Sequence, residues 1–281
     1  MRLETPVIYF YPPKGSTPAF DVDVKFRGGI LGEFYPKADA SVALDVERIG
    51  SKMQAGVVKS WDGATLKDYV VGSLRWKRVT LRKAASLPPT KSRVWLAPRR
   101  VGSSSVATPS GENERYLFYR GVANLAAVVQ TQLSSTAVRL RAPKHLHWLS
   151  QGSMTIASLW LVDIKSDGTA AFRQRDQIVI PRSAPSSELA ELPLFAVADY
   201  TVDHLADLRG SMKRALLASG LFEDEAEAML ETWKDSYFRN PGLRVFYVVP
   251  NEWTSYFLPL RISVPHQLDR VLMGRIDLLR E

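Results

Sequence analysis

Apolar and polar residues alternate along much of the first two thirds of the chain. In residues 20–27, "FDVDVKFR", the even positions are apolar and the odd positions are charged. This period of two is typical of a strand with one face in a core and the other in water. The apolar run before it, "VIYFYPP", predicts another strand that ends at Pro12 and Pro13, which cannot donate to a sheet.

Further strands are predicted in the same part of the chain. The Asp167-Gly168 pair predicts a hairpin turn, because glycine accepts a positive φ without steric cost. Many short strands separated by turn residues favour a β-sandwich-like arrangement. The predicted strands span residues 73–81, 93–98, 115–121, 136–143 and 154–164, followed by "AAFRQR" and "QIVIPR".

The pattern changes to a helical period beyond "SAPSSELAELP", residues 183–193, which we interpret as a linker. Helices are predicted at about 203–219 and 222–239, and strands follow at 243–250, 255–264 and 270–279. We therefore predict an α+β fold in two parts. Residues 1–185 form a β-sandwich-like region, and residues 186–281 form a helical hairpin packed on a small antiparallel sheet.

The second predicted helix is amphipathic. Its apolar residues, Ala226, Met229, Leu230, Trp233 and Tyr237, share one face, and Asp224, Glu227, Glu231 and Asp235 share the other. Carboxylates four residues apart can hold a metal or share a proton. The apolar stripe opposite them favours a solvated face instead, with the rings of Trp233 and Tyr237 packed inward.

The composition limits the available chemistry. The 281-residue chain contains no cysteine, which excludes disulfides, thiolate nucleophiles and iron–sulfur clusters. It contains no apolar stretch of the roughly 18 residues that a membrane helix needs. We expect no signal peptide in this chain, because the short apolar run at its start ends at two prolines and lacks the h-region; the alternative is the mature part of an exported protein. The net charge of +8 favours an anionic partner, although the cations are too dispersed to indicate nucleic acid. We expect no cofactor and no metal.

Histidines and embedded charges are the candidates for catalysis. His145 and His147 in "KHLHW" would point to the same side of a strand, where they supply at most half of a metal site. Exposed or hydrogen-bonded strand histidines are the simpler interpretation. Glu33, Arg120 and Asp235 lie within aromatic segments, where charged residues form either internal ion pairs or a site. Motifs for phosphate loops, zincins and nucleophile elbows are missing.

Basic and aromatic residues interleave in two segments, "RWKRVTLRK" and "RVWLAPRR". Such a surface can hold anions with its cations and stack sugars or bases on its tryptophans. The alternative is a sheet with the tryptophans inside and the cations in water. The candidate binding residues are Arg75, Trp76, Lys77, Arg78, Trp95, Arg99 and Arg100.

Several blocks together resemble a family of uncharacterised bacterial proteins. The blocks are "ETPVIYFYPP", "GGILGEFYPKA", "LFYRGV" and the stretch from "SGLFEDEAEAMLETWKDSYF" to "RVLMGRIDLL". Proteins of that family are of the exported or lipoprotein type, so the resemblance implies a periplasmic or cell-envelope location. It implies no activity and no catalytic residue.

These observations favour a noncatalytic binding or structural protein of the cell envelope, with an anionic or glycan polymer held on a basic, aromatic surface. The alternative is a hydrolase with a groove between the β-rich and α+β parts, using His145 and His147 or the charged residues Glu33, Arg120 and Asp235. The hydrolase requires these side chains to converge in a cleft within hydrogen-bond reach.

Overall fold

The computed structural model describes residues 2–3, 7–13, 18–46, 49, 69–83, 86–123, 125, 127–146, 148–150 and 152–278. The first strands are β1 (Arg2–Leu3), β2 (Val7–Ile8), β3 (Phe20–Arg27), β4 (Gly29–Tyr35), β5 (Asp39–Leu44), β6 (Val70–Arg82), β7 (Ser105–Ala107), β8 (Asn113–Glu114) and β9 (Leu117–Ala123). The later strands are β10 (Gln130–Leu133), β11 (Ala137–Arg141), β12 (Ser153–Ile164), β13 (Ala170–Pro181), β14 (Glu188–Pro193), β15 (Gly242–Val248), β16 (Leu260–Ile262) and β17 (Met273–Leu278). The helices are α3 (Arg93–Leu96), α4 (His204–Ala218), α5 (Glu223–Thr232), α6 (Lys234–Phe238) and α7 (Asn251–Phe257), with 3-10 turns η2 (Pro98–Arg100) and η3 (Val197–Asp199). The β-rich α+β class is confirmed.

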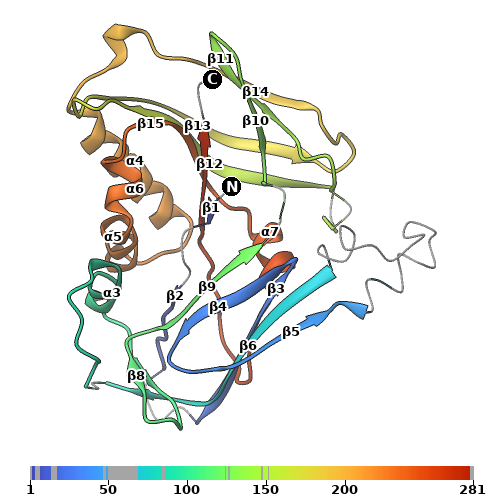
Figure 1. The fold of residues 1–281 in the computed structure, drawn as a ribbon, viewed down its shortest axis with the longest axis vertical. Helices are drawn as coiled ribbons and strands as arrows, with labels where there is room; N and C mark the ends of the chain where they lie inside the picture. Colours follow the sequence, from blue (N-terminus) through green and yellow to red (C-terminus); the bar gives the residue numbers. More distant parts are fainter. Residues whose placement is uncertain are drawn as a thin grey trace.

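An antiparallel five-stranded sheet, in the order β1-β17-β15-β12-β13, forms the upper half of the molecule (Figure 1). Its longest strands, β12 and β13, form the hairpin predicted at Asp167-Gly168, and Gly168 adopts a φ of 86°. The predicted boundary at residue 185 lies between β13 and β14. Strands from both sides of it join in this sheet, because β12 pairs with β15.

Helices α4, α5 and α6 cover one face of the five-stranded sheet (Figure 1). Their apolar stripes pack on Trp160 and Phe246 of the sheet, and the contributing helix residues are Leu208, Met212, Leu216, Ala226, Leu230 and Tyr237. Tyr237 is fully buried and Trp233 is partly buried. Glu227 of α5 is partnered by cations, because it pairs with Arg209 and Lys213 of α4. The predicted helical hairpin on a sheet is therefore correct.

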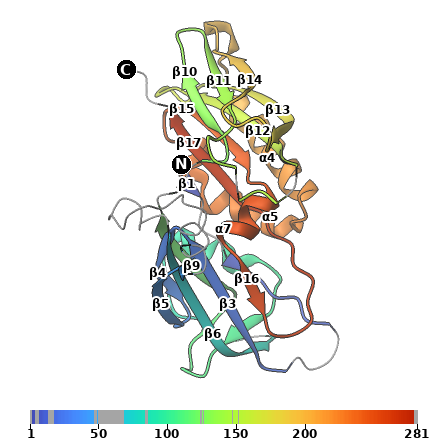
Figure 2. The same cartoon turned by 90° about the vertical axis from the view of Figure 1, so that its right-hand side faces the viewer.

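A strongly curved sheet forms the lower half of the molecule (Figure 2). Its main path is β16-β3-β6-β4-β9-β2, and β5, β7 and β8 join it at the sides. The alternation predicted for residues 20–27 is correct, because Phe20, Val22, Val24 and Phe26 are buried. This core continues into the second face of the upper sheet, which the small sheet β10-β11-β14 also covers. One hydrophobic core therefore joins the two halves.

Several predicted elements are wrong. Residues 93–98 contain helix α3 rather than a strand, and the predicted linker 183–193 contains strand β14, which pairs with β11. The predicted strand 255–264 begins inside helix α7, because Trp253 and Phe257 are buried at a helical spacing of four residues. The helix predicted at 222–239 is interrupted at Trp233, whose φ of −101° and ψ of 13° divide α5 from α6.

None of the helices in the described ranges is both long and apolar enough to cross a bilayer.

Candidate ligand-binding cleft

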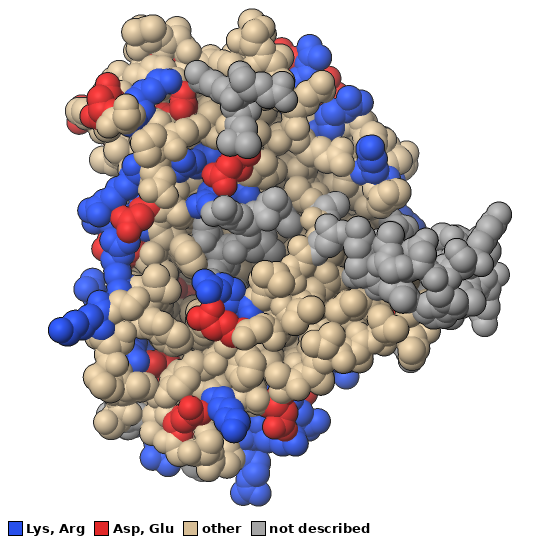
Figure 3. All heavy atoms as spheres, in the orientation of Figure 1, with Lys and Arg blue, Asp and Glu red and all other residues tan. Residues whose placement is uncertain are grey.

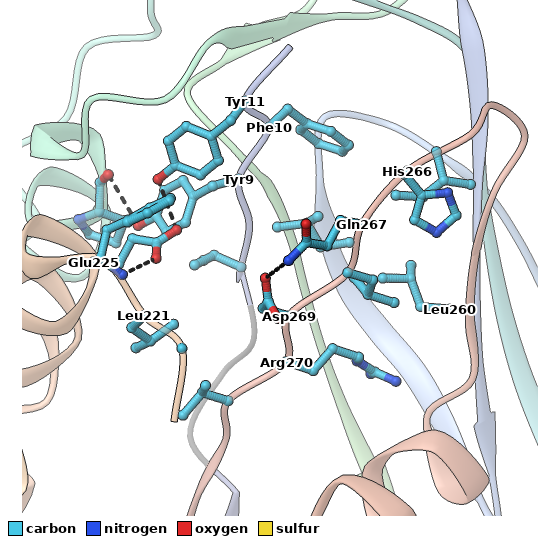
Figure 4. A pocket seen from close by; sticks show the side chains of 18 of the residues that line it. Tyr9, Phe10, Tyr11, Leu221, Glu225, Leu260, His266, Gln267, Asp269 and Arg270 are labelled. Atoms are coloured by element: carbon cyan, nitrogen blue, oxygen red, sulfur yellow. Dashed lines mark hydrogen bonds between the residues drawn. The ribbon is translucent and has the colours of Figure 1, made fainter. Parts of the chain in front are cut away.

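A cleft of about 600 Å³ opens between the two halves of the molecule (Figure 4). One wall is the segment Val7–Pro13, which contains β2 and the two prolines after it. The other walls are the start of α5, the strand β16 and the segment from Val264 to Met273 that connects β16 to β17. Most lining side chains are apolar, and a few polar groups lie among them. This combination is typical of sites that bind organic ligands.

A hydrogen-bonded group of aromatic and acidic residues forms one side of the cleft. The Tyr11 hydroxyl donates to Oε1 of Glu225 at 2.8 Å, and the Phe222 backbone N–H donates to Oε2 of Glu225 at 2.8 Å. The second bond caps helix α5, because Glu225 satisfies an N–H that has no partner within the helix. Tyr9 donates its hydroxyl to the carbonyl of Pro98 at 3.2 Å. Figure 4 shows Tyr9, Tyr11 and Glu225 grouped together.

Burial dominates the electrostatics of this group. It raises the pKa of Tyr9 and of Tyr11 above the usual tyrosine range, and the neighbouring Glu225 carboxylate raises both further. Both hydroxyls therefore stay neutral and act as hydrogen-bond donors at ordinary pH. Glu225 is already committed to two donors. The group supports the cleft wall and offers little general acid or base chemistry.

The segment between β16 and β17 supplies the other polar groups. Gln267 donates to Asp269 at 3.4 Å, and a ring nitrogen of His266 lies 2.8 Å from the carbonyl oxygen of Val264. His266, Gln267 and Asp269 are all exposed. Figure 4 shows Gln267 and Asp269 beside each other, with His266 farther along the segment. These side chains can contact a ligand from the solvent side.

Arg270 is the cation of the cleft. It is partly buried, and its Nη1 lies 3.4 Å from the carbonyl oxygen of Thr254. Burial lowers the pKa of Arg270, and contact with Tyr119 opposes that effect. Within the described ranges, no carboxylate forms an ion pair with this guanidinium. A partly buried guanidinium without a counter-ion is suited to accept an anionic group.

The predicted binding surface is dispersed and largely neutralised. Trp76 is 1% exposed and donates its indole N–H to the carbonyl of Pro36 at 2.7 Å. Trp95 stacks on Tyr116 and contacts Phe118. The tryptophans therefore pack inside or against the protein, as in the alternative weighed for these segments.

The cations of the same surface are mostly paired. Arg75 pairs with Asp21 at 2.6 Å, and Lys77 pairs with Asp39 at 2.7 Å. Arg99 pairs with the fully buried Glu114 at 2.6 Å. Arg78 and Arg100 are exposed and form no ion pair with another described residue. Figure 3 shows acids interspersed with cations on the visible face.

The candidate catalytic residues do not converge on one site. Glu33 and Arg120 form an exposed cross-strand ion pair between β4 and β9. Asp235 on α6 pairs with Arg93 and, at 3.2 Å, with Arg239. His145 is exposed in the segment between β11 and β12, and His147 lies outside the described residues. None of the four described candidates lines the cleft.

Sequence reasoning missed the residues that do line the cleft. Tyr9 and Tyr11 belong to the run "VIYFYPP", which indicates only a strand, and Glu225 lies in the acidic start of a predicted helix without a pattern that distinguishes it. The signal for Arg270 was weak, because a single arginine in a predicted strand has no special pattern. Three or more histidine, aspartate or glutamate side chains placed to hold a metal ion do not occur among the described residues.

Comparisons of this chain with protein-family models, with curated proteins and with solved structures find no match.

Proposed function

We propose that this protein is a noncatalytic binding protein of the cell envelope whose elongated, anionic ligand occupies the cleft between its two halves. The cleft of about 600 Å³ carries this proposal, because it combines an apolar lining with a few convergent polar groups. The net charge of +8 favours an anionic ligand over a neutral or cationic one, and so does Arg270, which has no carboxylate partner among the described residues. The location rests on the resemblance to exported bacterial proteins. A glycan polymer is the competing ligand class.

The hydrogen bonds that the polar groups of the cleft already make favour binding over catalysis. Glu225 accepts two hydrogen bonds that hold the wall together, and the tyrosine hydroxyls beside it are neutral donors. The hydrolase alternative gains no support from this arrangement. Glu33 and Arg120 pair with each other and Asp235 pairs with Arg93, and none of the three candidates borders the cleft.

Retention of the full chain on three materials tests the proposal. The materials are peptidoglycan, vesicles rich in phosphatidylglycerol, and a heparin column, each eluted with rising salt. Retention on at least one of them that falls with salt is expected, because an anionic ligand pairs with protein cations. Indifference to all three would reject an anionic or glycan envelope ligand.

A matched pair of variants then locates the site. Val264→Trp places a large ring in the cleft that Val264 lines, and Val197→Trp makes the same change at a residue that is 93% exposed and lies outside the cleft. Loss of retention in Val264→Trp alone supports the cleft. Equal retention in both variants would place binding elsewhere, with exposed Arg78 and Arg100 the next residues to replace.

A further inference from the structure

The two edge strands of the lower sheet border the same cleft. In the sheet order β16-β3-β6-β4-β9-β2, β16 pairs with β3 at one end and β2 pairs with β9 at the other. Leu260 and Ile262 of β16 and Val7 and Ile8 of β2 all line the cleft. The curved sheet is thus an incomplete barrel whose two edges both line the cleft.

Some backbone groups of β16 point away from β3, the one strand that pairs with it among the described residues. Lys25 N–H donates to Pro259 C=O at 3.0 Å, and Ser263 N–H donates to Asp21 C=O at 3.0 Å. In an antiparallel pair, residues alternate between bonding the partner and facing away from it. Leu260 and Ile262 lie between the bonding positions, so their N–H and C=O groups face away from β3. No second strand of the described chain pairs with β16.

The strand directions allow one additional strand to pair with both edges. Along the path from β16 to β2, four of the five pairings are antiparallel and the pairing of β4 with β6 is parallel. Because the strand direction reverses at each of the four antiparallel pairings, β16 and β2 run in the same direction. A single strand placed between them can therefore run antiparallel to both, which is the pairing that dominates this sheet.

The segment that connects β16 to β17 adds a charge requirement. Arg270 borders the cleft without a carboxylate partner in the described chain, and the segment His266–Val271 shows no hydrogen bond through its backbone groups to another described residue. A ligand that supplies a carboxylate and regularly spaced donors and acceptors matches both features. An acyl chain supplies no such donors, and a sugar chain lacks the spacing of a strand.

We infer that the cleft binds an extended peptide segment, which inserts between β2 and β16, closes the barrel and presents a carboxylate to Arg270. Addition of a strand to a free sheet edge is a general mode of peptide recognition, with backbone hydrogen bonds for affinity and alternate side chains for selectivity. The inference rests on the proposed function, because it names the ligand of the same cleft.

Selection from a phage-displayed library of random dodecapeptides on the full-length protein tests the inference. The enriched peptides are expected to alternate apolar and polar residues and to carry an acid. Affinities of the synthetic peptides are measured by fluorescence anisotropy, before and after single backbone N-methylation. Methylation at both odd and even central positions is expected to weaken binding about tenfold or more, since an inserted strand donates on both sides. If methylation weakens binding only at odd positions, only at even positions, or at neither, insertion between two strands is overturned.

Two protein variants test the same contact from the other side. Ile262→Pro removes the outward N–H of β16, whereas Ile262→Ala removes most of the side chain and keeps the N–H; an edge strand tolerates proline at such a position. With melting curves confirming that both variants fold, Ile262→Pro is expected to bind the peptide at least about tenfold more weakly than Ile262→Ala. Equal affinities would contradict strand pairing at β16.

Arg270→Gln tests the charge. It is expected to weaken binding of the acid-bearing peptide about tenfold and to leave binding of the same peptide with glutamine in place of the acid unchanged. Equal effects on both peptides would overturn the assigned carboxylate contact.

The outcomes separate this inference from the proposed function. If no peptide is enriched while Val264→Trp abolishes retention on peptidoglycan or vesicles, the peptide is rejected and the cleft remains the binding site. If neither peptide binding nor retention responds to Val264→Trp, both are rejected.

Discussion

The Tyr11 hydroxyl donates a 2.8 Å hydrogen bond to Glu225, a residue 214 positions later in the sequence. The ring of Tyr11 also meets the ring of Phe222 edge to face at 5.0 Å. Together these contacts attach the segment after β2 to the start of α5. They fix the width of the cleft at this wall, so the same pair of residues links the stability of the fold to the shape of the candidate site.

Tyr11→Phe is expected to destabilise the protein while leaving the ring contact in place. The hydrogen bond that this change removes has the charged Glu225 carboxylate as its acceptor. Tyr11 is 45% exposed, however, so water compensates for part of the lost hydrogen bond. A loss of about 1 kcal/mol in the free energy of unfolding is expected, measured by urea denaturation. Tyr256→Phe is the matched control, because no hydrogen bond of its hydroxyl to another described residue occurs. Equal losses in the two variants would contradict a contribution from the Tyr11–Glu225 bond.

Stability is expected to fall at alkaline pH. Burial is the largest cause of a raised pKa in Tyr9, Tyr116 and Tyr247. Above about pH 10, the unfolded chain loses these protons while the folded chain keeps them, so stability present below about pH 10 is lost as the pH rises further. The expected slope is roughly 1.4 kcal/mol per pH unit for each tyrosine that stays protonated.

Urea unfolding at a series of alkaline pH values measures this slope, and phenolate absorbance in the near ultraviolet follows ionisation directly. Ionisation of the buried tyrosines is expected to coincide with unfolding. A stability that stays constant between about pH 10 and about pH 11.5 would contradict the burial of these hydroxyls.

Glu114→Gln is expected to be strongly destabilising. Glu114 is fully buried and accepts hydrogen bonds from Arg99 at 3.0 and 2.6 Å. Replacing this carboxylate by a neutral amide leaves the charge of the largely buried Arg99 uncompensated, which lowers the free energy of unfolding by about 3 kcal/mol or more. Glu33→Gln removes one partner of an exposed cross-strand pair with Arg120 and is expected to cost less than about 1 kcal/mol. Similar costs at the two sites, measured by chemical denaturation, would show that burial does not distinguish these pairs.

Gly274→Ala and Gly32→Ala are expected to act in opposite directions. A Cβ on Gly274 in β17 would overlap the ring of the fully buried Tyr247, whereas a Cβ on Gly32 in β4 would meet no atom within 4 Å. The first change is expected to destabilise by about 1 to 3 kcal/mol, because the ring must move within a packed core. The second is expected to be neutral or to stabilise by up to about 1 kcal/mol. If Gly274→Ala left the free energy of unfolding unchanged, the core around Tyr247 would have rearranged to accept the added methyl group.

Local patterns predicted the elements whose apolar residues follow one period without interruption. The alternation in β3, the hairpin of β12 and β13 and the stripe along α4 and α5 each reflect burial of a single face. Residues 93–98 and 251–257 contain aromatic residues that suit a strand and a helix equally well. Tertiary packing favours the helix in both segments, where α3 and α7 form. The serine-rich residues before β14 suggested a linker, but the residues that follow them form a strand, β14, because they pair with β11.

The candidate site was much less predictable than the fold. Val7–Pro13, Glu225 and Arg270 come from three distant parts of the sequence, and only the packing of the two halves brings them to one cleft. Local periodicity contains no information about which edges of a sheet meet. The cations predicted to bind a ligand carried the right types of side chain, but acids from other strands, such as Asp21 and Asp39, pair with them.

The pairing of early strands with late ones also sets the order of folding. β1 pairs with β17 in the upper sheet, and β3 pairs with β16 in the lower sheet. During synthesis, neither sheet can be completed until residues 260–278 have been made, so the earlier strands wait with open edges. Contacts so distant in sequence slow folding and prolong exposure to aggregation. We therefore expect this protein to fold after translation and to depend on chaperones during that interval.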